Sequence, residues 1–130
     1  KGVLQRSRSA EHFRNTFGGY MELTHRKEGN TVVVAISGRL DAVSSPEFDE
    51  EVNSLMGQGE NAFILDLEKL DYISSAGLRS ILATAKKLKG EKGGLSLASL
   101  QEMVREVFEI SGFDSIIPIY HDLDSALEDI

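Results

Sequence analysis

Residues 62–82 constrain the fold more than any other part of the chain, because they indicate a buried strand that leads into an amphipathic helix. The four apolar residues 62–65 follow one another without alternation, which is typical of a strand covered on both faces in a largely parallel sheet. Further on, apolar side chains recur at helical spacing, at Leu78, Ile81, Leu82, Ala85 and Leu88. Ser74 and Ser75 therefore lie where strand gives way to helix, after a second short apolar run.

The position of these two serines supports two interpretations. The first turn of a helix has N–H groups without intrahelical partners and the positive end of the helix dipole, so it favours an anion. Either serine can also act as a simple N-cap, which contributes about 1 kcal/mol. Gly77 fits a cap alone less well, because glycine in the first turn costs about 0.5–1 kcal/mol relative to alanine and instead permits close backbone approach. The residue types leave a structural cap and a functional serine both open.

Two segments resemble the recurrent motifs of a known family. LDYISSAGLR, residues 70–79, resembles the signature of STAS domains, and in particular of the stand-alone anti-sigma-factor antagonists. GRLDAVSSPEF, residues 38–48, resembles the second recurrent segment of that family, in which Asp41 lies near the phosphorylation site. The likeness spans residues 21–130 and implies a STAS-like domain over that range.

This resemblance implies a phosphorylation-controlled interaction switch with no catalysis of its own. In the family, the serine that matches Ser75 is phosphorylated by a partner serine protein kinase that is itself the anti-sigma factor, so Ser75 is the predicted acceptor and Ser74 its rival. The unphosphorylated protein would bind the kinase and free a sigma factor, the phosphorylated protein would release the kinase, and a PP2C-type phosphatase would reset the system. The partner-binding set implied is Asp41, Ser74, Ser75, Ala76, Gly77, Leu78 and Arg79. The alternative is a STAS-type ligand-binding or scaffolding module of a transporter or secretion complex, in which Ser75 is a mere cap.

Composition favours one cytoplasmic domain without a cofactor. A chain of 130 residues with 41% hydrophobic and 27% charged residues is long and apolar enough for one ordinary core. It has no cysteine, which excludes disulfides, thiolate metal sites and a cysteine nucleophile. No apolar run approaches the roughly 20 residues of a membrane span, and no signal-peptide pattern opens the sequence.

Charge is distributed unevenly along the chain. The net charge is −7, yet residues 1–20 are basic, so the remainder is strongly acidic and is not expected to bind nucleic acid. Residues 1–20 also lack an apolar period that a core could use. We expect them to be a leader, flexible or added during expression, with a basic arm for an acidic surface as the alternative.

The residues give little support to an enzyme. The three histidines are scattered without the spacing of metal ligands or a catalytic triad, at His12, His25 and His121. No glycine-rich nucleotide motif is present. Three carboxylates before the serines could be read as magnesium ligands but are more typical of solvated turns: Asp66, Glu68 and Asp71.

Asp41 is the more promising carboxylate. It leaves a predicted buried strand at the end of the sheet where the serine helix is expected to begin. We expect it to hydrogen-bond the Ser75 hydroxyl and hold it for attack on a phosphoryl donor that a partner supplies.

Upstream of residue 62, two strand-like runs predict a β-hairpin. Residues 23–27 and 31–37 are separated by Gly29-Asn30, a turn signal that favours positive φ. The second run is rich in β-branched residues and too continuous to be half exposed, so we place it inside the sheet. Residues 38–41 are expected to leave the sheet as a loop.

A helix is expected after this loop. Ser44 or Ser45 is its predicted cap, with Pro46 in the first turn, where a missing N–H is harmless. Its predicted buried side comprises Phe48, Val52, Leu55 and Met56.

Downstream of the serine helix, residues 86–94 are expected to form a solvated exit and residues 95–98 a short strand. Ser99 and Glu102 match a capping box for the next helix, which should end at Gly112. The predicted apolar face of that helix comprises Leu100, Met103, Val104, Val107 and Phe108.

The chain should end with a weak strand and a short helix. Residues 116–120 can form only an edge strand, because Pro118 has no N–H to donate to a ladder. Asp122 or Asp124 is the predicted cap of a terminal helix.

The order β-β-α-β-α-β-α-β-α predicts an α/β fold with a single mixed, mostly parallel sheet, an antiparallel N-terminal hairpin and about four helices. Binding sites in such sheets lie beyond the carboxyl ends of the strands. The loops that hold Asp41 and Ser75 both follow strands, so they should converge at one end of the sheet.

Overall fold

The structure is a computed structural model that describes residues 20–129. The leader predicted over residues 1–20 lies outside this range apart from Tyr20. The strands are β1 (Met21–Glu28), β2 (Thr31–Leu40), β3 (Ala62–Asp66), β4 (Leu70–Ile73), β5 (Gly94–Ala98) and β6 (Ile119–Tyr120). The helices are α2 (Ser45–Gly57), α3 (Ser75–Gly90), α4 (Glu102–Ser111) and α5 (Leu123–Glu128), with a 3-10 turn, η2 (Phe113–Ser115).

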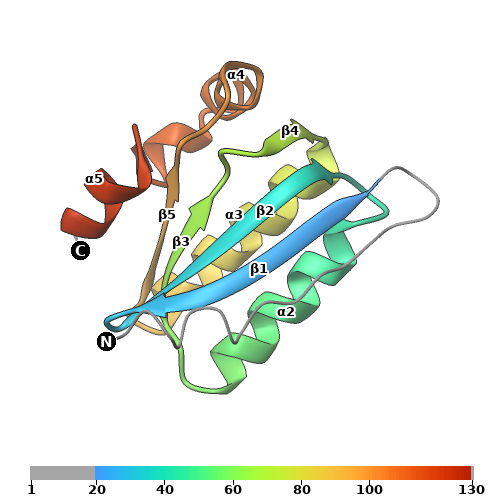
Figure 1. The fold of residues 1–130 in the computed structure, drawn as a ribbon. Helices are drawn as coiled ribbons and strands as arrows, with labels where there is room; N and C mark the ends of the chain where they lie inside the picture. Colours follow the sequence, from blue (N-terminus) through green and yellow to red (C-terminus); the bar gives the residue numbers. More distant parts are fainter. Residues whose placement is uncertain (1–19, 130) are drawn as a thin grey trace.

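All six strands belong to one sheet, in the order β1-β2-β3-β5-β6, and β4 pairs with β2. The β1–β2 pair is antiparallel and every other pair is parallel. Figure 1 shows α2 and α3 running along the sheet, whereas α5 lies beside β5 and α4 packs next to β4. The predicted mixed, mostly parallel sheet with an N-terminal hairpin is confirmed.

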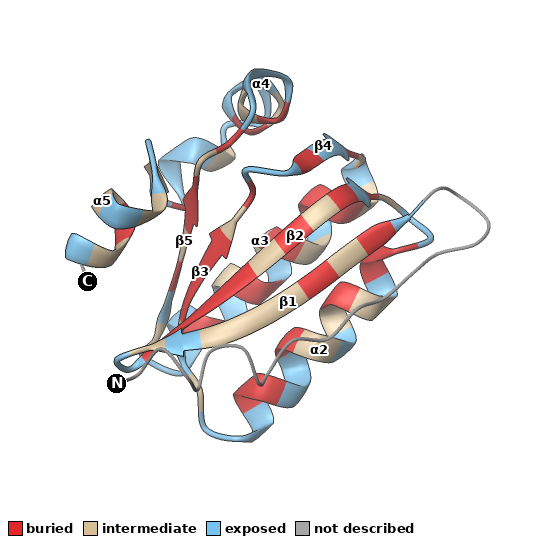
Figure 2. Cartoon of the chain, viewed as in Figure 1, coloured by how far each residue is buried: buried red, intermediate tan, exposed pale blue. Residues whose placement is uncertain are grey.

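The unbroken apolar run of β3 is explained by burial on both faces of the sheet. Phe63 and Leu65 belong to the main core, which α2 and α3 cover. Ile64 packs in a second, smaller cluster with Ala98 of β5 and Ala126 of α5. Figure 2 shows the buried residues concentrated on the central strands and the inner sides of the helices. A strand covered from both sides has no reason to alternate with polar residues.

The hairpin is confirmed, but β2 is longer than expected. Gly29 adopts a φ of 65° in the turn, as its place in a two-residue hairpin loop requires. The loop predicted over residues 38–41 is wrong, because Gly38, Arg39 and Leu40 continue the strand. Strand β2 pairs with β3 up to Ala35 and with β4, a strand that was not predicted, from Gly38 onward. Two partners in succession therefore keep this stretch extended.

Several boundaries after α3 also differ from expectation. The solvated connecting segment predicted over residues 86–94 is wrong in its first half, because residues 86–90 are still part of helix α3. The capping box is wrong: Ser99 adopts a φ of 63°, and α4 begins after Gln101 without a side-chain cap. Met103 is 70% exposed and does not join the apolar face that buries Val104 and Phe108.

The C-terminal expectations are confirmed except for the extent of the edge strand, which was predicted over residues 116–120 and covers only Ile119–Tyr120. Gly112 ends α4 in the left-handed conformation, and the short strand β6 lies at the edge of the sheet beside β5. Asp122 caps α5 by accepting a hydrogen bond from the Ser125 N–H. This end of the chain covers the face of β3 and β5 that α2 and α3 leave open.

Candidate protein-interaction site

The segments that hold Asp41 and Ser75 meet at one end of the sheet, as predicted, although the strand before Ser75 is the unpredicted β4. Leu40 pairs in parallel with Ile73, and the Ser74 N–H donates to the Leu40 carbonyl at 2.9 Å. Asp41 directly follows the first strand, and Ser75 follows the second by two residues. Pairing of the two strand ends thus brings the two motif segments together.

The two serines have different roles in the structure. Ser74 is the N-cap of α3: its backbone is extended, and its Oγ accepts from the Gly77 N–H at 3.2 Å. Ser75 is the first residue of the helix and is exposed. Its hydroxyl makes no hydrogen bond to any group within residues 20–129. Ser74 therefore serves as the structural cap, which leaves the Ser75 hydroxyl available for chemistry.

Because only Ser74 caps the helix, we expect one alanine substitution to lower stability and the other to leave it nearly unchanged. Ser74→Ala removes the cap and should lower the free energy of unfolding by about 1 kcal/mol. Ser75→Ala removes no contact and should leave stability within about 0.5 kcal/mol, since alanine suits a helix. Urea denaturation of the two variants beside the wild type measures both values. Equal losses would mean that the two hydroxyls share the capping role.

Gly77 permits a close approach between α3 and the end of β2. A Cβ at this position would lie 2.5 Å from the Leu40 carbonyl oxygen and 3.0 Å from carbon atoms of Leu40 and Ile73. The following residue, Leu78, is buried in the main core. Two members of the implied partner-binding set, Gly77 and Leu78, therefore hold the helix in place. Of the others in this helix, Ser75 and Arg79 are exposed and Ala76 is half-buried.

Asp41 makes no hydrogen bond to Ser75, so the expected bond between them is wrong. Its Oδ1 instead accepts from the N–H groups of Val43 and Ser44, each at 3.1 Å. The Ser44 hydroxyl, which was expected as a possible cap of α2, donates to the Arg39 carbonyl at 2.8 Å and makes no cap bond. Asp41 is thus the centre of its own tight turn, because a short carboxylate readily bonds the backbone two residues on.

The turn also lowers the pKa of the Asp41 carboxyl group. Burial alone would raise the pKa of Asp41, but hydrogen bonds from Ser44 and Val43 and the nearby Arg39 charge outweigh it and hold the pKa below its ordinary value. The carboxylate form is therefore the one that the fold favours.

Asp41→Ala should lower the free energy of unfolding by about 1–2 kcal/mol at neutral pH, because the N–H groups of Val43 and of the buried Ser44 lose their acceptor. Asp41→Asn keeps one acceptor oxygen and should lose less. The pKa of Asp41 is lowered in the folded state, so its stabilisation is complete above the unfolded pKa of about 3.9 and is lost as pH falls through the folded pKa. Urea denaturation at pH 7 and pH 3 should therefore show the gap between wild type and alanine variant narrowing in acid, and a constant gap would contradict this role.

An arginine and an aromatic residue beside Asp41 were not predicted as site residues. Arg39 and Tyr72 are cross-strand neighbours in β2 and β4, and the guanidinium carbon lies 4.2 Å from the ring centroid. The Arg39 Nε is also 3.6 Å from the Asp41 Oδ2. Tyr72 and Val43 are exposed large side chains at 39% and 48%. Aromatic residues and arginine dominate binding energy at protein interfaces, so this stack extends the candidate surface around Ser75.

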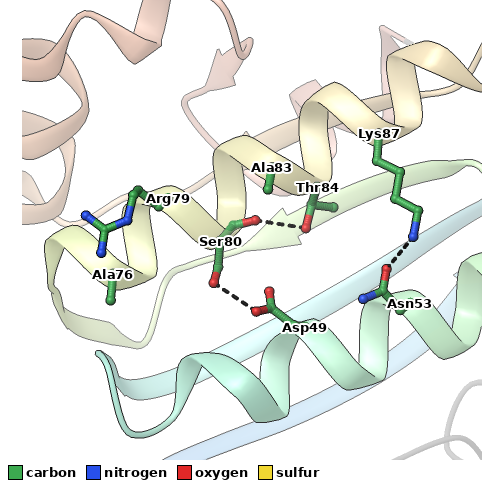
Figure 3. Close-up of a pocket in the computed structure, with 8 residues that line it drawn as sticks. All are labelled: Asp49, Asn53, Ala76, Arg79, Ser80, Ala83, Thr84 and Lys87. Atoms are coloured by element: carbon green, nitrogen blue, oxygen red, sulfur yellow. Dashed lines mark hydrogen bonds between the residues drawn. The ribbon is translucent and has the colours of Figure 1, made fainter.

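A groove of about 390 Å³ lies between α2 and α3 and includes Ala76, the residue that follows Ser75 in the sequence (Figure 3). Its lining comprises Asp49, Asn53, Ala76, Arg79, Ser80, Ala83, Thr84 and Lys87. Ser80 donates to Asp49 at 3.2 Å, and Lys87 donates to Asn53 at 2.9 Å, so polar contacts join the two helices along the groove. Sequence spacing could not predict this groove, because it depends on how α2 lies against α3.

The metal-ion interpretation finds no support in the part of the chain described. Within residues 20–129, no three His, Asp or Glu side chains are grouped to hold a metal ion. Asp66 instead accepts from the Glu68 N–H at 3.2 Å, which is a turn contact. In the same range, no helix combines the length and apolarity needed to cross a bilayer.

Comparisons with known proteins identify the family. Residues 22–126 match the model of the STAS domain, and the chain therefore belongs to the STAS domain family. The candidate anti-sigma factor antagonist BtrV of Bordetella bronchiseptica is 41% identical over 106 residues, 82% of this chain and 91% of that protein. The anti-sigma-B factor antagonist of Bacillus subtilis is 33% identical over 94 residues, 72% of this chain and 85% of that protein.

A solved structure agrees with these relatives. The crystal structure of an anti-sigma factor antagonist from Mycobacterium paratuberculosis is 25% identical, with a TM-score of 0.79, and covers 85% of this chain and 93% of that chain. The chain thus shares its fold and family with proteins named as anti-sigma factor antagonists.

Proposed function

We propose that this protein is an anti-sigma factor antagonist controlled by phosphorylation of Ser75. The observation that carries the proposal is the exposed, unbonded Ser75 hydroxyl at the first position of α3, beside a second serine that already caps the helix. Unphosphorylated, the chain binds an anti-sigma factor that is also a serine protein kinase. Phosphorylated, it releases that partner, and a PP2C-type phosphatase restores the first state. The chain supplies no catalysis itself and acts in the cytoplasm.

The helix start can accept a phosphate without harm to the fold. A phosphoserine adds about −1.5 to −2 charges at neutral pH. At Ser75 this charge would lie at the positive end of the α3 dipole, in the first turn of a 16-residue helix. Arg79 is exposed and four residues further along, a spacing that brings two side chains together on one side of a helix. The same charge would face a bound partner, where desolvation and repulsion oppose binding.

Among residues 20–129, no side chain activates the acceptor hydroxyl. The Asp41 Oδ1 accepts hydrogen bonds from the turn that Asp41 forms. No carboxylate or histidine in the described part of the chain hydrogen-bonds the Ser75 Oγ. We therefore assign the general base for phosphoryl transfer to the kinase, together with the nucleotide. This arrangement suits a substrate that is modified by its own binding partner.

The phosphorylation site can be mapped with two matched variants. Wild type, Ser74→Ala and Ser75→Ala are each incubated with the cognate anti-sigma factor kinase and ATP, and the phosphopeptides are located by mass spectrometry. We expect one phosphate on wild type and on Ser74→Ala, and none on Ser75→Ala. A phosphate on Ser74, or full modification of Ser75→Ala, would remove Ser75 from the proposal. No association with any such kinase would favour a ligand-binding or scaffolding module instead.

A further inference from the structure

A second, larger pocket lies at the other end of α3 from Ser75. It has a volume of about 650 Å³ and is formed by the starts of β3 and β5, the last turns of α3 and the segment before β6. Helix α3 has 16 residues, so at about 1.5 Å per residue the two ends lie roughly 24 Å apart. The pocket is therefore a separate feature from the groove between α2 and α3.

The interior of this pocket is largely apolar. Phe63 of β3 and Leu95 of β5 line it on the side of the sheet, and Ile116 and Pro118 line it next to β6. Ile116 is 55% exposed, which is unusual for an isoleucine and leaves an apolar side chain facing solvent at this wall. The volume lies within the usual range of small-molecule sites, about 300–1,000 Å³.

Three lysines line the same pocket, Lys86, Lys89 and Lys92. None of their ammonium groups pairs with a carboxylate in the described part of the chain. This concentration of unpaired positive charge occurs in a protein with a net charge of −7. The C-terminal dipole of α3 favours a cation at Lys89, in the last turn, but it gives no reason for Lys92, which lies beyond the helix.

Lys92 is also held in a backbone conformation that lysine disfavours. Its φ is 63°, in the left-handed region where glycine is the usual residue after a helix. The turn is fixed by the Gly93 N–H, which donates to the Leu88 carbonyl at 2.7 Å. Gly93 cannot carry a side chain, because a Cβ there would collide with the Asn61 backbone carbonyl. Lys92 therefore lines the pocket from a tight turn in which glycine would be less strained.

We propose that this pocket binds an amphiphilic anion, a medium-chain fatty acid, with its carboxylate among the three lysines and its alkyl chain against the apolar interior. The lysines and the apolar interior match the two halves of such a ligand. Charge-assisted hydrogen bonds to the carboxylate give orientation, and burial of the alkyl chain gives affinity. The proposal does not rest on phosphorylation of Ser75.

Decanoate below its micelle concentration is the probe, titrated into the isotope-labelled full chain and followed by amide NMR shifts. We expect saturable shifts at Phe63, Leu95 and Ile116, and unchanged shifts at Ser75. Decanol tests the need for the charge, and acetate tests the need for the chain. Binding of decanol or acetate as tight as that of decanoate, shifts without saturation, or shifts at the Ser75 end would each overturn the proposal.

Variants in α3 and at Lys92 just after it test the role of the lysines. The double variant Lys86→Gln/Lys89→Gln should weaken decanoate binding by roughly tenfold or more, the value of one strong interaction. Lys87→Gln is the control, since Lys87 bonds Asn53 of α2 and does not line this pocket. Lys92→Gly should weaken binding and at the same time raise the melting temperature, because it relieves the positive φ. Unchanged affinity in the double variant, or an equal loss in Lys87→Gln, would refute the site.

Discussion

Replacing Ser75 by aspartate should weaken binding of the cognate anti-sigma factor by about 100-fold, whereas Ser75→Ala should keep affinity within about threefold. Alanine removes a hydroxyl that makes no contact in the described chain. Aspartate adds a charge where the proposed interface is centred, among Tyr72, Val43 and Arg79. The aspartate also lies at the favourable end of the α3 dipole, so the variant should fold. Loss of binding without loss of folding is the result that a switch requires.

Isothermal titration calorimetry of wild type and both variants measures this difference. Ser115→Asp is the matched control, because it adds the same charge at an exposed serine in η2, far along the chain from α3. We expect Ser115→Asp to bind like wild type. Equal affinities for wild type and a properly folded Ser75→Asp would count against electrostatic release at this serine.

Gly77→Ala should lower the free energy of unfolding by about 2 kcal/mol, in the range of overpacked cores, despite the better helix propensity of alanine. The added Cβ would lie 2.5 Å from the Leu40 carbonyl oxygen, which the Ser74 N–H holds in place. Relief requires that the start of α3 move away from the end of β2. The loss corresponds to a fall in melting temperature of about 5–10 °C for a domain of this size.

Gly90→Ala is the control for this substitution, because it changes the same residue type at the other end of the same helix. No atom lies within 4 Å of a Cβ built at Gly90. Alanine should therefore be neutral there or stabilise by up to about 1 kcal/mol. Thermal melts of the two variants decide the matter. Similar behaviour of Gly77→Ala and Gly90→Ala would show that close approach at Gly77 is not needed.

The parts of the fold that were predicted correctly are those with a strong local signal. The unbroken apolar run of β3, the helical spacing in α3 and the turn at Gly29 each follow from a short stretch of sequence. Strand β4 was not predicted, because four residues with only Leu70 and Ile73 buried give too short a pattern. Without β4, the strand character of Gly38–Leu40 and the pairing of Arg39 with Tyr72 could not be foreseen.

The candidate site shows the same limit at the level of single side chains. Topology was enough to predict that the two motif segments converge. It could not predict the hydrogen-bond partners of Asp41, because these are N–H groups of the turn that Asp41 itself forms. Ser74 and Ser75 are equally suitable caps by residue type. Only the extended backbone at Ser74 makes it the cap and leaves Ser75 at the first helical position.

Reversible release by a real phosphate tests the central claim most directly. The chain phosphorylated by its cognate kinase is purified and titrated against that kinase, then treated with a PP2C-type phosphatase and titrated again. The account predicts strong binding before phosphorylation, binding weakened by about 100-fold or more with one phosphate on Ser75, and full recovery after the phosphatase. Unaltered affinity of a chain shown by mass spectrometry to carry its phosphate on Ser75 would contradict the account.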